Sequence, residues 1–422
     1  MKPFFLAMML ALQFPAVAGP RLPAPFTAEQ VQQWQQDLSV FGEQLQARHI
    51  DLYHRISSQR FHAQLNQLMA RLPLMNRYQL MVGLKRLARQ VGDGHTIAGP
   101  WANDMYRFPV RFKRFADNKV YLIASGATAK PLLGMELVSI DGTAIGQALV
   151  LAAGIAPTGS ANVHAERGAS AGVFNKSDLL FGLGLLHHLD RVIYTLKDSA
   201  GKRHRLALTA LANSPYQQAM RYRLRHAQHY GFTPVYQAMP GLSLAVNPAL
   251  KAAYIDFSRY PKDLPGMLQF AGQVRQAINQ QQLRRLVIDL RHNGGGDFFL
   301  GLALASQLIT LDQLDWRHGI YVLISNATFS AGASNAIQFR QILNAKLVGQ
   351  ATAGNPNGYQ EASVFYLPNS HWPVQYSKRL YRFTMAKTAG VQPDKAIAMP
   401  WPAYRQGKDP QLAWVLKDMA QH

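Results

Sequence analysis

The sequence predicts an α/β protein in which a C-terminal core follows a helical region and a short β region. Apolar residues recur at helical spacing to about residue 90, short β runs occupy 108–160, and strands alternate with helices from about residue 240. This alternation favours a parallel sheet with helical crossovers. We expect five segments: a signal peptide (1–18), a helical cap (19–98), a β region (99–160), a connecting α+β segment (161–238) and an α/β core (239–422).

The first residues have the pattern of a signal peptide. Lys2 supplies a positive charge, Phe4 to Leu12 form a short apolar run, and Ala16-Val17-Ala18 has the small residues of a cleavage site. A bilayer-spanning helix needs about 20 apolar residues, so this run favours export over a membrane span. We expect a mature chain that starts near Gly19 and is periplasmic or secreted, with an uncleaved membrane anchor as the alternative.

Composition excludes several kinds of chemistry. The chain has no cysteine, which rules out disulfides, a cysteine nucleophile and cysteine metal sites. Its 44 Lys and Arg residues outnumber 23 Asp and Glu, giving a net charge of +21. Because the basic residues are dispersed and no nucleic-acid motif accompanies them, we expect no nucleic-acid partner and only loose association with anionic envelope surfaces.

Three helices are expected in the helical cap. Thr27 and Gln30 form a capping box, which satisfies free amide donors at a helix start. A second helix follows Ser57, and a third covers 78–89. The first helix has one apolar face, formed by Val31, Trp34, Leu38, Phe41 and Leu45.

The rest of the chain divides into β runs and then an α/β pattern. The runs FPVRF, KVYLIA and MELVSIDG predict strands between residues 108 and 142, and a hairpin is expected around a turn at 198–201. A helix is expected over 179–189. In the core, strands are expected over 251–258, 285–290, 319–325 and 346–351, and helices over 264–281, 298–309 and 331–343.

Two motifs lie where core strands end, the edge at which such sheets usually carry their chemistry. RLVIDLRHNGGGD (285–297) takes a buried strand into three glycines, whose amides beside a helix start suit a negative charge. A phosphate site is disfavoured because no phosphate-binding fingerprint is present; a plain tight turn is the alternative. In ISNATFSAG (324–332), Ser330 heads a helix, as a nucleophile or as an ordinary N-cap.

At this point the chain resembles the tail-specific (C-terminal-processing) peptidases and the tricorn core protease. The resemblance rests on DLRHNGGG, TFSAG, GQATAG (349–354) and GVQPD (390–394), and loosely on LGMELVSIDG (133–142), which is similar to the strand-turn core of a PDZ domain. It implies a crotonase/ClpP-like catalytic core with a helical cap and a PDZ-like region over 99–160. It also implies Ser330 as the nucleophile, with an oxyanion hole formed by the amides of Gly295 or Gly296 together with Ala331.

A serine nucleophile needs a base. In the tail-specific branch this is a lysine about 25 residues after the serine, but that position holds Asn355, and Lys346 has the wrong spacing. The tricorn-like branch uses a histidine before the PDZ-like region. His95, in the GDGHT turn (92–96), occupies that place, and imidazole suits proton transfer near neutral pH. We interpret the neighbouring Asp93 as a turn residue.

A third group should orient the imidazole. The glutamate that tricorn-like proteins carry before GVxPD is absent here, where the stretch reads AKTA (386–389). Some exported relatives place an acidic residue after the TxG strand, and Glu361 is the corresponding candidate. Ala333 is a further departure, because many tail-specific peptidases carry glutamate there.

The sequence therefore predicts an exported serine hydrolase, most specifically a peptidase acting on peptide or protein substrates. Ser330 forms the acyl-enzyme, His95 is the general base, and no metal or cofactor is expected. One alternative is a catalytically inactive peptide-binding protein of the same fold. The other is an esterase or amidase acting on envelope components.

Overall fold

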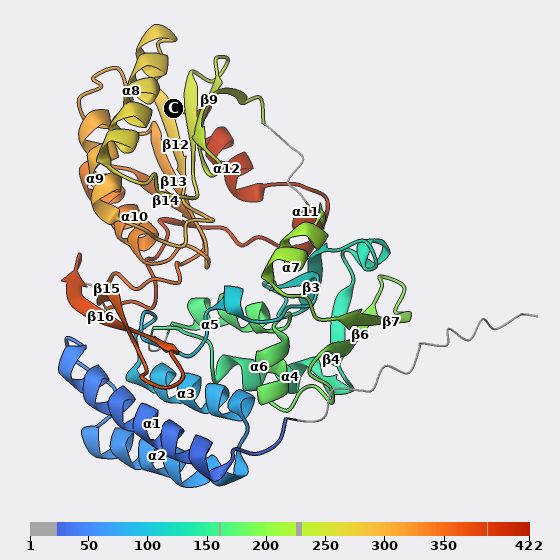
Figure 1. Ribbon diagram of the computed structural model, residues 1–422. Helices are drawn as coiled ribbons and strands as arrows, with labels where there is room; N and C mark the ends of the chain where they lie inside the picture. Colours follow the sequence, from blue (N-terminus) through green and yellow to red (C-terminus); the bar gives the residue numbers. More distant parts are fainter. Residues whose placement is uncertain (1–22, 160–161, 225–229, 386) are drawn as a thin grey trace, which may run out of the picture.

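The computed structural model describes residues 23–159, 162–224, 230–385 and 387–422. The expected signal peptide lies outside these residues. Figure 1 shows the α/β core at one end of the molecule, the helical cap at the other, and a mainly β region between them. The segments that join the core to the cap also build the candidate site described below.

The helical cap consists of α1 (Ala28–Arg48), α2 (Ser58–Arg71) and α3 (Arg77–Val91). The capping box at Thr27 is present, and Ser57 caps α2 as its side chain accepts a hydrogen bond from the Arg60 amide. The predicted apolar face of α1 is directed inward, because Leu38, Phe41 and Leu45 are fully buried. Three helices with these apolar faces account for the hydrophobic core of the cap.

The middle region is an antiparallel sheet with strand order β2-β3-β4-β6-β7, flanked by four helices. Its predicted hairpin forms, because β6 and β7 pair on either side of the turn at 198–201. The helix expected over 179–189 is shorter and ends at Gly182, where the chain turns toward β6. The strands are β2 (Val110–Arg114), β3 (Val120–Ser125), β4 (Glu136–Ile140), β5 (Thr143–Ala144), β6 (Arg191–Lys197), β7 (Arg203–Thr209) and β8 (Tyr222–Arg223), and the helices are α4 (Ile145–Ala153), α5 (Val163–Ser170), α6 (Ser177–Gly182) and α7 (Asn213–Ala219).

The core sheet has strand order β17-β14-β13-β12-β11-β10-β9, and its strands from β11 to β17 are parallel. In Figure 1, α8 (Leu264–Gln280), α9 (Phe298–Leu308) and α10 (Ala331–Ile342) cover one face, and α12 (Pro410–Met419) covers the other; α11 (Trp401–Arg405) precedes α12. The predicted order of strands and helices is confirmed here within one or two residues. The strands are β9 (Thr233–Met239), β10 (Leu242–Asn247), β11 (Ala252–Phe257), β12 (Arg285–Asp289), β13 (Ile320–Ile324), β14 (Lys346–Gly349) and β17 (Lys395–Ala396).

A long hairpin leaves the core and joins the helical cap. β15 (Asn357–Tyr366) pairs with β16 (Pro373–Arg382), and β16 pairs with the short β1 (Ile97–Ala98) that follows α3. Trp372 beside this hairpin packs on Trp34 of α1, with ring centroids 4.7 Å apart. The hairpin thereby fastens the turn that contains His95 to a segment of the core chain (Figure 1).

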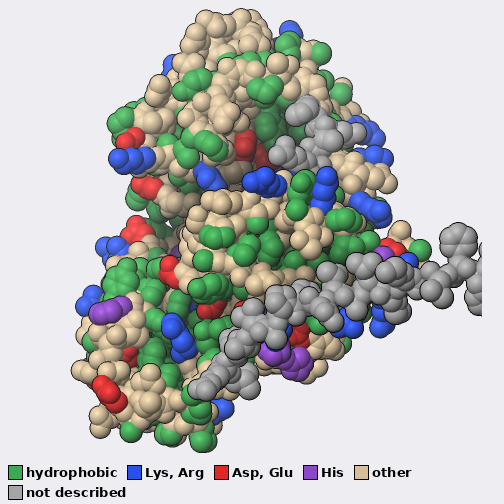
Figure 2. Space-filling view, turned by 45° about the vertical axis from the view of Figure 1, so that its right-hand side comes forward, with side chains coloured by type: hydrophobic (Ala, Val, Ile, Leu, Met, Phe, Trp, Pro, Cys, Tyr) green, Lys and Arg blue, Asp and Glu red, His purple; other side chains and the backbone are tan. Residues whose placement is uncertain are grey.

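Basic side chains are dispersed over the face of the molecule shown in Figure 2. Figure 2 shows Lys and Arg side chains spread over the visible face, with some of them arranged in a row across its middle. Among the helices in the described ranges, none combines the length and the hydropathy of a membrane span.

Candidate active site

Ser330 lies in a strained turn between β13 and α10. Its backbone has φ 51° and ψ −128°, a conformation that costs a non-glycine residue on the order of 1–3 kcal/mol unless the surroundings hold it. The side chain caps no amide of α10, so the structure does not use it as an N-cap. Its hydroxyl stays partly exposed at the positive end of the helix.

Hydrogen bonds fasten this strained turn to the glycine turn that follows β12. Thr328 Oγ1 donates to the Leu290 carbonyl (2.8 Å), and the Phe329 amide donates to the Asn293 carbonyl (2.9 Å). Ser325 Oγ donates to a third carbonyl on the same segment, 2.6 Å away. The parallel pairing of β12 and β13 brings both turns to one edge of the sheet, so these bonds offset the strain at the serine.

A buried ion pair supports the glycine turn from behind. Arg291 donates from Nη2 to Asp289 (2.6 Å) and from Nη1 to Asp409 (2.7 Å). Burial alone would raise the pKa of Asp289, but the guanidinium beside it holds that pKa at about 2. At neutral pH, Asp289 is therefore ionised and paired with Arg291 below the glycine turn.

Gly295 packs directly against the serine. A Cβ on this glycine would lie 2.6 Å from Ser330 Cβ, and its φ of 115° also disfavours any side chain. Its amide donates to Asn293 Oδ1 (2.9 Å) and is therefore occupied. The amides of Gly296 and Ala331, by contrast, have no acceptor within the described part of the chain. Of the three expected oxyanion donors, the structure leaves these two available.

The His95 turn is organised by the buried carboxylate of Asp93. Asp93 Oδ1 accepts the amides of His95 (2.8 Å) and Thr96 (2.6 Å), which confirms its expected part in the turn. Oδ1 also accepts a hydrogen bond from Ser377 Oγ on β16 (3.0 Å), and Oδ2 accepts one from Nε2 of His49, the residue that follows α1 (2.8 Å). Burial alone would raise the pKa of Asp93, but the hydrogen bond and charge of His49 hold it below its usual value. The carboxylate is therefore ionised.

The structure brings His95 and Ser330 together across 235 sequence positions. His95 Nε2 lies 2.9 Å from Ser330 Oγ, and the imidazole stacks on the Phe329 ring with centroids 4.7 Å apart. The Tyr359 backbone carbonyl accepts a hydrogen bond from the same imidazole. Burial lowers the pKa of His95, against the opposing effects of Asp93 and this carbonyl. The imidazole is consequently neutral at pH 7, the form that accepts a proton.

Within the described residues, the contacts of Glu361 are with residues other than His95. Its carboxylate accepts a hydrogen bond from the Tyr381 hydroxyl (2.5 Å) and lies 3.9 Å from Arg379 Nε, and its side chain is about one-third exposed. A backbone hydrogen bond with Tyr359, two residues earlier in the same strand, raises the pKa of the imidazole and partly offsets the effect of burial. The sequence predicts an acidic side chain in this segment, and a contact made by the backbone has no residue signature.

The residue at the expected lysine position and the nearest lysine both have structural contacts. Asn355 Oδ1 accepts hydrogen bonds from Asn162 Nδ2 (2.8 Å) and the Gly390 amide (3.0 Å), so it joins three segments at the wall of the site. Lys346 Nζ pairs with Asp418 (2.8 Å) on the α12 side of the sheet. Neither side chain is placed to take the proton of Ser330.

Ser330 and His95 open into a cavity of about 120 Å³. Its walls come from the His95 turn, the segment after β14 and the start of β15. Among the described residues, no group of three His, Asp or Glu side chains is placed to hold a metal ion. Besides the serine and histidine, the cavity is lined by His54, Gly159, Asn355, Tyr359, Gln360 and Leu380.

Comparison with known proteins places this site in a known fold. Neither a protein-family model nor a curated protein matches the sequence. Mature CPAF complexed with lactacystin, however, matches with a TM-score of 0.64 over 93% of this chain and 98% of that chain, at 14% identity. A CPAF mutant gives 0.65 over 93% and 97%. The chain has the fold of CPAF.

This match confirms the expected α/β fold with a helical N-terminal region. A further match is the photosystem II D1 C-terminal processing protease, with a TM-score of 0.43 and 16% identity over 88% of this chain and 94% of that chain. A putative S41 protease from Bacteroides fragilis NCTC 9343 also matches, with a TM-score of 0.37 and 14% identity over 77% of this chain and 85% of that chain. At 14% identity the likeness to CPAF shows the fold, and the roles of single residues rest on the geometry of the site.

Proposed function

We propose that this protein is a serine peptidase in which Ser330 is the nucleophile and His95 the general base. The observation that carries the proposal is the 2.9 Å contact between Ser330 Oγ and His95 Nε2. The neutral imidazole and the strained, partly exposed serine support it. So does the fold shared with CPAF, whose complex with lactacystin is a solved structure.

The geometry favours acyl transfer to water. Ser330 Oγ attacks the peptide carbonyl while its proton passes to His95 Nε2. Nε2 is the ring nitrogen that faces the hydroxyl, so it is the nitrogen that accepts the proton. The ionised Asp93 carboxylate favours the imidazolium that forms. His95 then protonates the leaving amine, and water attacks the acyl-enzyme by the same route.

The oxyanion that forms on the carbonyl requires fixed donors. We assign the Gly296 and Ala331 amides to this role, because both are free of internal acceptors and Ala331 begins α10. Gly295, with its amide bound to Asn293, supplies space beside the nucleophile. Removing one such donor costs enzymes of this kind about 3 kcal/mol of transition-state stabilisation.

We further propose that the chain is exported and processed after Ala18, which rests on the n-region, apolar run and cleavage pattern of 1–18. Intact mass of the protein recovered from the periplasm or medium tests this proposal. A chain that begins at Gly19 is expected. A full-length chain held in the membrane fraction would instead support the uncleaved anchor.

Hydrolysis assays separate the peptidase from its two alternatives. The wild type is incubated with a peptide library, simple esters and muropeptides, beside Ser330→Ala and the exposed control Ser306→Ala. We expect peptide cleavage that Ser330→Ala abolishes and Ser306→Ala retains. Cleavage confined to esters or muropeptides would favour the envelope esterase or amidase. Peptide binding that survives Ser330→Ala, without any cleavage, would favour an inactive peptide-binding protein that uses the PDZ-like region.

A further inference from the structure

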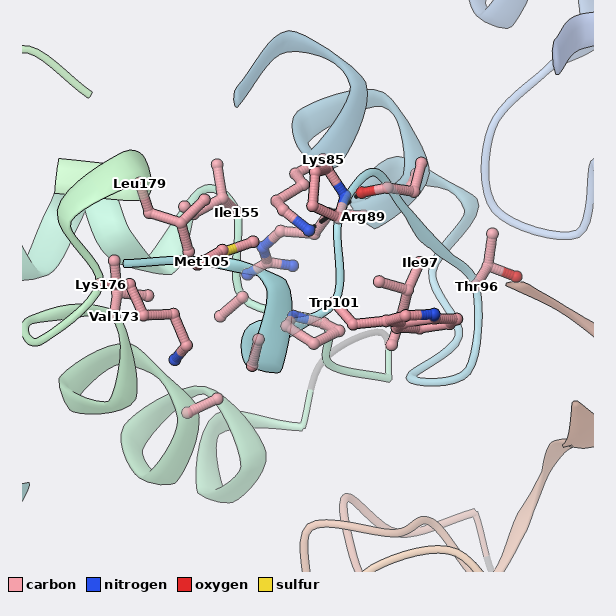
Figure 3. Close-up of a pocket in the computed structure, with 17 residues that line it drawn as sticks. Lys85, Arg89, Thr96, Ile97, Trp101, Met105, Ile155, Val173, Lys176 and Leu179 are labelled. Carbon is pink, nitrogen blue, oxygen red and sulfur yellow. Dashed lines mark hydrogen bonds between the residues drawn. The ribbon is translucent and has the colours of Figure 1, made fainter. Parts of the chain in front are cut away.

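A second cavity, of about 250 Å³, lies beside α3 and is independent of the serine. Its border includes Thr96, Ile97 and Ala98, the residues that directly follow His95. Figure 3 shows side chains entering it from α3 and, on another wall, from the segment around α6, with Met105 between them. Most of its surface is apolar, formed by Ile97, Trp101, Met105, Ile155, Val173 and Leu179.

Two lysines, Lys85 and Lys176, face this apolar space without a carboxylate partner. Within the described part of the chain, Lys85 Nζ donates to the Ala98 carbonyl (3.0 Å) and Lys176 Nζ donates to the Gly172 carbonyl. Neither ammonium forms an ion pair there. The third cation at the cavity differs, because Arg89 is paired with Glu166 at 2.7 Å.

The two ammonium groups are costly to hold in this place. Burial, together with the charge of Lys176, lowers the pKa of Lys85 to about 8. Burial and the charges of Arg107 and Arg111 lower the pKa of Lys176 to about 8 as well. All the charges that act on these lysines are therefore positive. Both lysines are half-buried. An ammonium that is partly removed from water without a counter-ion is unfavourable, and an anion bound at the lysines would reduce that cost.

We propose that this cavity binds a small amphipathic carboxylate, a fatty acid of medium chain length, with its carboxylate at Lys85 and Lys176 and its chain along the apolar wall. The cavity is just below the range of about 300–1,000 Å³ typical of ligand pockets, which limits the occupant to a small molecule. The apolar lining favours an alkyl chain over a phosphate or a sugar. The inference does not depend on the proposed peptidase activity.

Binding is measured on the purified full chain with decanoate, acetate and decanol as probes. Acetate has the charge without the chain, and decanol has the chain without the charge. We expect decanoate to raise Tm and to change the fluorescence of Trp101, which lines the cavity, far more than either control. Trp101→Phe assigns the fluorescence change. No response to decanoate, or an equal response to decanol, would overturn the proposal.

Variants locate the site. Lys85→Met and Lys176→Met each remove a charge and keep the side-chain length, and each is expected to weaken decanoate binding about ten- to a hundredfold, the value of one charge-assisted hydrogen bond. Lys85→Arg retains binding because it keeps the charge. Arg86→Met is the matched control, since Arg86 is exposed on the same helix. Unchanged decanoate affinity in both lysine variants, with Tm of the free proteins preserved, would overturn the proposal.

Discussion

At the scale of single residues, the sequence predicts the contact between Ser330 and His95 but not the backbone contact of Tyr359 with the imidazole. Ser330 and His95 each lie in a short motif, and the structure places them 2.9 Å apart. The backbone of Tyr359 acts on the pKa of the imidazole, whereas Glu361 is bonded to Tyr381. A backbone acceptor depends on where a strand runs, so no residue type marks it.

The pH dependence of hydrolysis follows from the state of His95. Because burial lowers the pKa of His95 below the usual value of about 6.5, the neutral, proton-accepting form persists to lower pH than in a free imidazole. We expect kcat/KM to rise with pH, with its inflection below about pH 6.5. The measurement is a profile of kcat/KM in buffers of constant ionic strength. An inflection above that pH would contradict the assignment of this histidine as the base.

Glu361 provides a direct test of which group orients the imidazole. Glu361→Gln is expected to change the activation free energy by less than about 0.5 kcal/mol, the usual range for a surface side chain. His95→Ala, as the positive control, should lose orders of magnitude in rate. Both rates are measured by reaction with a fluorophosphonate. If the labelling rate fell as much in Glu361→Gln as in His95→Ala, Glu361 would be a member of the catalytic group.

At the scale of elements, the site depends on two turns at the carboxyl ends of β12 and β13. Gly295→Ala tests their packing, because the new Cβ would lie 2.6 Å from Ser330 Cβ. A displacement of the nucleophile by about 1 Å can cost about a hundredfold in rate. We expect a loss of that order in the rate of fluorophosphonate labelling.

Gly294→Ala is the matched control for this prediction. No heavy atom lies within 4 Å of a Cβ built at Gly294, which neighbours Gly295 in the same turn. Its labelling rate should stay close to that of the wild type. Equal losses in the two variants would show that the turn tolerates no side chain at all and that contact with the serine is not the reason.

The elements themselves are largely predictable from the sequence, because their signals are local. Caps, apolar periodicity and alternating strands placed α1 to α3 and the core from β11 to β14 within a few residues. The helix expected over 179–189 is wrong beyond Gly182, since apolar residues continue after the helix ends. The sequence does not predict the hairpin of β15 and β16, because its pairing with β1 is a long-range contact.

At the scale of the whole molecule, the helical cap and the core cooperate to hold the His95 turn. Asp93 in this turn binds His49, the residue that follows α1, and Gln375 Nε2 on β16 donates to the His95 carbonyl (2.7 Å). The base thus belongs to the cap side of the molecule and the nucleophile to the core side. The hairpin must therefore pack on the cap if His95 is to lie beside Ser330.

Trp372→Ala tests this coupling. Trp372 is 6% exposed and packs on Trp34, so its loss should reduce the free energy of unfolding by about 3–5 kcal/mol. Labelling of Ser330 should slow as well, because the hairpin also carries Tyr359 and Gln375. Urea denaturation and labelling rates are measured beside Tyr366→Ala, a control 61% exposed on the same hairpin. Lower stability with an unchanged labelling rate would contradict the coupling.

The most direct test of the central claim is covalent labelling of the purified protein with a fluorophosphonate, read by intact mass and peptide mapping. The account predicts a single adduct located on Ser330, absent from Ser330→Ala and strongly slowed in His95→Ala. A folded wild type that remains unlabelled, or an adduct on another residue, would contradict the assignment of Ser330 and His95 as the catalytic pair.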